Sequence, residues 1–108
     1  MGVMVIALFR PKPGGELEMM ACMRDHQSVL RAEGLTTDRP AYVMRAGDGT
    51  LLEVFEWKSQ AAIDAAHGNA NVHKLWARYA RCCDYVTLAD LAEAATMFPG
   101  FEPVDVTA

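Results

Sequence analysis

The chain has 108 residues, of which 52% are hydrophobic and 22% are charged, and its formal net charge is −4. This length suits a single domain with one core, and the hydrophobic share excludes an intrinsically disordered chain. The ten Lys and Arg residues are scattered, so no basic face is expected to bind nucleic acid or an anionic membrane.

The longest apolar run and the cysteines indicate where the protein resides. The run from Val3 to Phe9 is too short to span a bilayer, and no basic residue precedes it as in a signal peptide. The three cysteines, Cys22, Cys82 and Cys83, form an odd set without CxxC spacing, which favours a reducing compartment. We therefore expect a cytoplasmic protein whose cysteines are small buried hydrophobic residues.

The first predicted elements are a strand and a helix. The β-branched residues 3–10 predict a strand that stops at Pro11, and residues 16–33 predict a helix that Gly34 ends. The apolar stripe of this helix comprises Met19, Cys22, Met23, His26 and Leu30. His26 is thus expected on the buried face.

A hairpin and a broken second helix follow. Two β-rich runs within residues 41–58 flank a Gly-Asp-Gly turn at 47–49, which predicts two antiparallel strands. Ser59 is predicted to cap a helix from Gln60 to about His67, and Asn71 to cap the next helix. The stripe of that helix comprises Val72, Leu75, Trp76, Tyr79 and Cys83. Residues 84–88 predict a fourth strand, and residues 89–108 a mixed tail with one possible helical turn and an extended segment at 101–106.

The element order β, α, β, β, α, β predicts an α+β, ferredoxin-like domain spanning residues 1–108, with its core at about 3–88. In this arrangement a four-stranded antiparallel sheet carries both helices on one face. The first and third predicted strands, however, are apolar on both faces, whereas a sheet with one solvated face should alternate apolar and polar residues. We therefore predict a homodimer through the second sheet face.

The run EVFEWKSQAAIDAAHGNANVHKLWARY, residues 53–79, resembles the dimeric α+β barrel superfamily, and within it the antibiotic biosynthesis monooxygenase-like domains. The resemblance covers roughly residues 3–88. It implies a dimeric α+β barrel that binds a small apolar or aromatic ligand. The haem-degrading branch of the superfamily is disfavoured, because Ala77 stands at the position of the haem ligand and the first strand has no Asn.

The quinol-forming branch works without metal or flavin, so the resemblance implies no cofactor. It binds a polycyclic phenol between helices and sheet, where the protein supplies desolvation, orientation and a base. The spacing of His67 and His73 also makes a metal pair improbable, and no metal site is expected.

Three residues are candidate catalytic groups. His26 is a candidate base, or alternatively a core histidine bonded to a backbone carbonyl or to Glu53. Glu53 shares a strand face with two aromatic residues and is the second candidate, or else lies at the dimer edge beside an Arg. His67 matches the family's helix-end histidine and lies three residues after Asp64, which could orient its ring; a solvated helix end is the alternative.

Three further residues are candidate substrate contacts. Trp57 and Trp76 could stack on an aromatic ligand, although aromatic residues at such spacings are more often core. Met23 could line an adaptable pocket or simply fill it. The leading hypothesis is a cofactor-independent monooxygenase acting on aromatic or quinol compounds, and the alternative is a non-catalytic homodimer that binds a ligand or has a structural role. A cavity of roughly 300 Å³ or more, with His26 and a carboxylate converging, would favour the enzyme.

Overall fold

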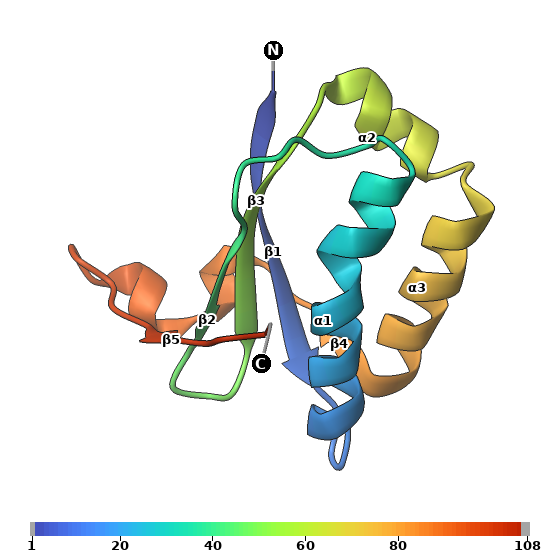
Figure 1. The fold of residues 1–108 in the computed structure, drawn as a ribbon. Coiled ribbons are helices and arrows are strands. Elements are labelled where there is room, and N and C mark those ends of the chain that lie inside the picture. The colour runs from blue at the N-terminus through green and yellow to red at the C-terminus, as the bar shows by residue number, and fades with distance from the viewer. Residues whose placement is uncertain (1, 107–108) are drawn as a thin grey trace.

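The computed structural model describes residues 2–106 and shows an α+β fold with one antiparallel sheet (Figure 1). The strands are β1 (Val3–Pro11), β2 (Tyr42–Arg45), β3 (Leu51–Trp57), β4 (Cys83–Tyr85) and β5 (Glu102–Pro103). The α-helices are α1 (Glu16–Ala32), α2 (Gln60–Ala66) and α3 (Ala70–Cys82), and two 3₁₀ turns cover Leu88–Asp90 and Ala92–Ala95. None of the helices in this part of the chain is long and apolar enough to cross a membrane.

The strand order is β4-β1-β3-β2-β5, with every neighbouring pair antiparallel. The helices α1 and α3 lie together on one face of the sheet, as Figure 1 shows, and the order of the first four strands is compatible with a ferredoxin-like class. The prediction of four strands was wrong, because residues of the tail add a fifth. Met44 and Arg45 pair with Pro103 and Glu102, which makes β5 the edge next to β2.

The helix boundaries follow their capping residues. The Ser59 side chain accepts a hydrogen bond from the Ala62 N–H at 3.1 Å, which confirms the predicted cap of α2. The cap of α3 is Asn69 rather than Asn71, because Asn69 has an extended backbone and its side chain accepts from the N–H groups of Asn71 and Val72. This helix ends at Cys82, so Cys83, predicted on the helical stripe, begins β4 instead.

The core lies between the sheet and the helices. Tyr79 of α3 is fully buried at its centre, where its ring stacks on Phe9 of β1 with centroids 4.5 Å apart. The Tyr79 hydroxyl donates to the Met23 sulfur at 3.1 Å, and desolvation raises the pKa of this phenol far above its usual range. This hydrogen bond links the buried faces of α1 and α3.

The outer face of the sheet is covered in part by the chain's own tail. Leu91, on the tail after β4, is buried against Leu8 and Leu52 of the outer face. Figure 1 shows the tail on the side of the sheet opposite α1 and α3. Met4 and Ile6 remain about half exposed. The tail therefore covers the part of the outer face around Leu8 and Leu52.

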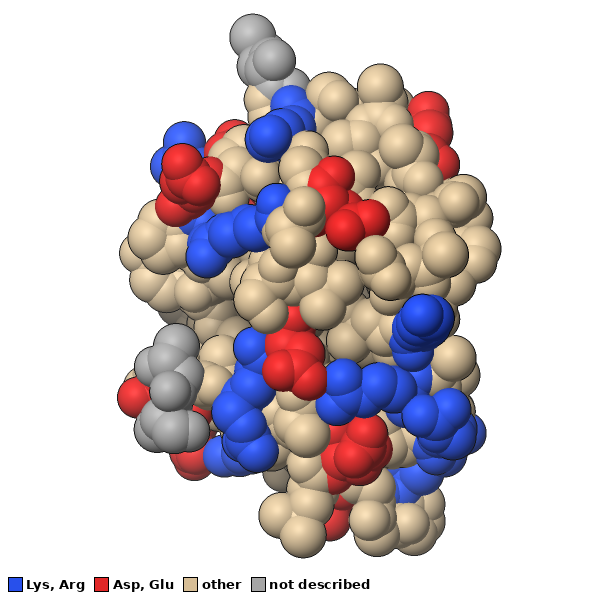
Figure 2. All heavy atoms as spheres, turned by 45° about the vertical axis from the view of Figure 1, so that its right-hand side comes forward, with Lys and Arg blue, Asp and Glu red and all other residues tan. Residues whose placement is uncertain are grey.

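The face shown in Figure 2 carries positive and negative side chains next to one another. Arg78 of α3 bridges to α1 through Asp25 at 2.8 Å and Glu18 at 3.4 Å. The hydrogen bonds to Asp25 and Glu18 raise the pKa of this guanidinium, which stays charged at any physiological pH. Such exposed pairs orient the helices and contribute little to the free energy of unfolding.

Gly15 caps the first helix at a point where only a hydrogen fits. A Cβ at this position would lie 2.2 Å from the carbonyl oxygen of Cys82, which accepts a hydrogen bond from Lys12. We expect Gly15→Ala to lower the free energy of unfolding by about 1–3 kcal/mol, because the turn must move away from α3. Urea denaturation would measure this loss. Gly100→Ala, where no atom lies within 4 Å, is the control, and equal stability of both variants would contradict the prediction.

Candidate functional site

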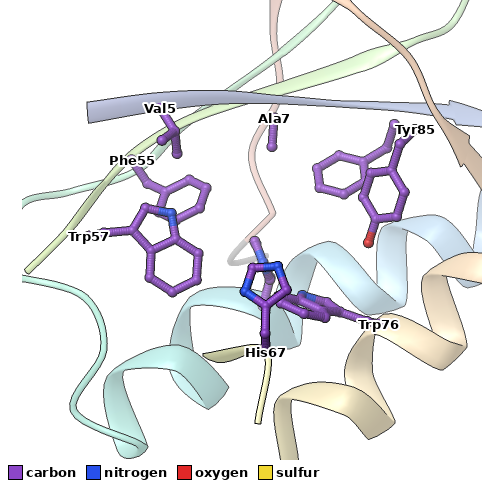
Figure 3. A pocket seen from close by; sticks show the side chains of 9 residues that line it. Val5, Ala7, Phe55, Trp57, His67, Trp76 and Tyr85 are labelled. Carbon is purple, nitrogen blue, oxygen red and sulfur yellow. The ribbon is translucent and has the colours of Figure 1, made fainter. Parts of the chain in front are cut away.

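A cavity of about 420 Å³ lies between the sheet and the helices (Figure 3). Its volume falls in the range of small-molecule sites, and its walls are mainly aromatic and aliphatic. The sheet contributes Val5, Ala7, Phe9, Phe55, Trp57 and Tyr85, and the helical side contributes His26, His67 and Trp76. Figure 3 shows His67 and Trp76 across the cavity from the labelled sheet residues.

His26 is held in one orientation inside this wall. Its Nδ1 bonds to the Glu53 carboxylate, and the rings of Phe9, Phe55 and Tyr79 meet its imidazole edge to face at 5.4–6.1 Å. Because a carboxylate accepts, the shared hydrogen sits on Nδ1, and in the neutral form of the ring Nε2 carries a lone pair. The described residues offer Nε2 no hydrogen bond, which leaves it available to a ligand in the cavity.

Glu53 is the most completely buried charged side chain described, with 1% of its surface exposed. It faces the helices because it shares one face of β3 with Leu51 and Phe55, and the small Ala7 lies opposite it on β1. One carboxylate oxygen binds His26, while Oε2 has no hydrogen-bond partner among residues 2–106. Burying a carboxylate this way is costly, so the pair is expected to have a role beyond packing.

His67 follows the last residue of α2 and lines the same cavity. Its Nδ1 donates to the Ile63 carbonyl at 2.9 Å, so in the neutral form of the ring its Nε2 is the acceptor. The prediction that Asp64 orients this ring was wrong, since Asp64 accepts from Gln60 instead and the ring is held by the backbone. The structure thus brings His26 and His67 to one apolar space.

The remaining predicted contacts divide between two places. Trp57 and Trp76 line the cavity, and Trp76 meets the His67 ring with centroids 5.3 Å apart. Met23 lies outside this cavity, in the core and beside a second cavity of about 580 Å³. Sequence reasoning missed Tyr85, because its position in the short β4 depends on the register with Phe9. Burial raises the pKa of Tyr85 to about 12, so its hydroxyl remains a donor at neutral pH.

The described residues hold no group of three or more His, Cys, Asp or Glu side chains placed to bind a metal. All three cysteines are free and buried, as predicted. Desolvation raises the pKa of Cys22 to about 11 and that of Cys83 to about 12, so these thiols stay protonated and unreactive at neutral pH.

The burial of the thiols predicts their reactivity. Native protein at pH 8 should show almost no fast reaction with a chromogenic disulfide reagent, because all three thiols are buried and those of Cys22 and Cys83 are also protonated. After unfolding in guanidinium chloride, three equivalents should react. One rapidly reacting thiol in the folded protein would contradict this placement, and Ser28→Cys, at an exposed position, is a positive control.

Comparisons with protein-family models, with curated proteins and with solved structures find no match for this chain.

Proposed function

We propose that the protein is a cofactor-independent monooxygenase that acts on an aromatic phenol or quinol in the 420 Å³ cavity. The observation that supports this proposal is the His26 ring, which is fixed by Glu53 and three aromatic side chains and lines an otherwise apolar space. A base with one fixed lone pair next to an aromatic-lined cavity suits proton removal from a flat substrate. The resemblance to antibiotic biosynthesis monooxygenase-like domains points to the same chemistry.

In the proposed reaction, His26 Nε2 takes a proton from an activated methylene group flanked by aromatic rings. The resulting carbanion reduces O₂ and forms a carbon–oxygen bond, giving a peroxide that recovers the proton from His26. Loss of water from this hydroperoxide leaves a carbonyl, so R₂CH₂ + O₂ gives R₂C=O + H₂O. The carbon loses four electrons and the two oxygen atoms gain them, with no other reductant. The apolar walls would keep bulk water away from the carbanion.

His67 Nε2 and the Tyr85 hydroxyl are proposed to position the substrate. The first accepts a hydrogen bond and the second donates one, so a phenol hydroxyl and a ring carbonyl could both be held. Trp57 and Trp76 would contact the rings of the substrate. Their role in this proposal is orientation, whereas His26 touches the reacting carbon.

An oxygen electrode with anthrone-like phenols and hydroquinones tests this function. We expect oxygen uptake above the uncatalysed rate, and a loss of about 10²–10⁴-fold in His26→Gln, which can still donate to Glu53. Ala7→Leu, which places a larger side chain in the cavity, should abolish uptake at low substrate concentration. Lys74→Gln on the exposed side of α3 is the control. Substrate binding without uptake would support the competing function, a non-catalytic binding protein.

We also propose that two copies associate as a dimeric α+β barrel through the part of the outer sheet face that the tail leaves open. Met4, Ile6 and Tyr42 expose 53%, 49% and 67% of their surface there, and Val54 lies between them in the sheet. An apolar patch of this kind on a sheet is typical of a protein interface. The expected dimer is cytoplasmic and needs no metal or cofactor.

A further inference from the structure

A second cavity, of about 580 Å³, lies on the other side of α1 from the candidate site. Its walls come from α1, from the connector before β2, from β2 and β3, and from the end of the tail. Val43 of β2 and Val106 of the tail provide apolar surface. The volume is that of a small-molecule site.

Two buried polar atoms at this cavity lack a partner within residues 2–106. Glu53, 1% exposed, has an unpartnered carboxylate oxygen, Oε2, and Gln27 has an unpartnered amide nitrogen, Nε2. An unsatisfied buried acceptor and an unsatisfied buried donor each destabilise the folded chain, because each has given up its hydrogen bonds to water. Both residues line the same space, so one ligand that carries a donor and an acceptor could satisfy both.

The charges around the cavity restrict the ligand further. The carboxylates of Glu53 and Asp38 disfavour an anionic ligand, and the guanidinium groups of Arg24 and Arg31 disfavour a cationic one. Arg31 donates to the carbonyls of Thr37 and Arg39 and so holds the connector over α1. A neutral head group with a donor beside an acceptor, on an apolar body, fits these requirements.

We propose that the second cavity binds a small carboxamide, whose N–H donates to Glu53 Oε2 and whose carbonyl accepts from Gln27 Nε2. Glu53 connects the two cavities, because it lines the second cavity and its other oxygen binds His26 in the wall of the first. A ligand that binds Oε2 therefore changes how strongly the other carboxylate oxygen accepts the hydrogen bond from His26. The second cavity is in this way an effector site for the base. This regulatory part rests on the proposed function, whereas the binding itself does not.

Methyl NMR separates the two cavities, because Val43 and Val106 line the second and Val5 lines the first. Titration with benzamide should shift Val43 and Val106 to saturation and leave Val5 unchanged. N,N-dimethylbenzamide has no N–H to donate and benzoate is charged, so each should bind at least about tenfold more weakly. Gln27→Leu should weaken benzamide binding by at least about fivefold. His67→Gln should not change it, because His67 lines the first cavity and not the second.

Benzamide should also shift the imidazole ¹⁵N resonances of His26, because Glu53 binds that ring through its other oxygen, whereas N,N-dimethylbenzamide at the same concentration should not. Shifts at Val5 alone, equal binding of the dimethyl compound, or no saturation would overturn the site. Saturation without any His26 response would overturn the effector role. None of these readouts requires oxygen uptake, so a protein that binds benzamide but consumes no oxygen refutes the proposed function and keeps this site.

Discussion

Replacing His26 by Leu alone should lower the free energy of unfolding by about 3–5 kcal/mol, because the Glu53 carboxylate then remains buried without its partner. Replacing both residues, His26→Leu with Glu53→Leu, should recover this loss and can add about 1–4 kcal/mol relative to the natural chain. The reason is that two apolar side chains of similar volume need no desolvation of charge. Urea denaturation of the three proteins at neutral pH measures both values.

The double variant separates stability from function. If the pair exists for function, the double variant folds as well as the natural chain and has no base for oxygen uptake. A double variant as unstable as His26→Leu would instead show that the pair is a structural requirement of the core. Leu75→Ala, in the core and outside the linings of both cavities, is a control. Its free energy of unfolding should fall by about 2–5 kcal/mol, and Glu53→Leu should not restore it.

A single charged substitution on the outer sheet face is expected to prevent two copies of the chain from associating. Sedimentation equilibrium at micromolar concentration should show a dimer for the natural chain and a monomer for Ile6→Lys, because a charge then occupies the open part of the outer sheet face. The variant should keep its fold, since Ile6 is half exposed in the single chain. Leu17→Lys, also apolar and exposed but on the first turn of α1, is the matched control and should remain a dimer.

A monomeric natural chain would contradict the proposed interface. In that case the tail residues around Leu91, which already cover part of the face, would be the only cover that the sheet needs. Oxygen uptake by such a monomer would still support the proposed chemistry, because all nine residues of the cavity come from one chain.

Much of the fold could be predicted because its signals are local. Ser59 before a helical run, the Gly-Asp-Gly turn and the stripe containing His26 each depend on residues close in sequence. The fifth strand could not be predicted in this way. Glu102 and Pro103 lie in the segment 101–106 that the sequence predicts as extended, but their pairing with β2 depends on the path of the tail, which also buries Leu91 against the sheet.

The buried faces that carry the candidate site residues could be predicted from the sequence. Periodicity places His26 and Glu53 each on a buried face. The bond that joins them in the structure is one of the alternatives predicted for His26. Which residues share one cavity depends on how α1 and α3 sit over the sheet, and no periodicity in the chain encodes that. Met23 shows the limit, since its stripe position is right and yet it borders the second cavity rather than the first.

The strand order has a consequence for synthesis of the chain. The two edge strands, β4 and β5, both come from the last quarter of the sequence, whereas the three central strands are complete at Trp57. During translation the unpaired edges of β1 and β2 therefore stay open until residues 83–103 emerge, and open edges are templates for aggregation. A ribosome that stalls or a protease that cuts after α3 would release a sheet with both edges bare.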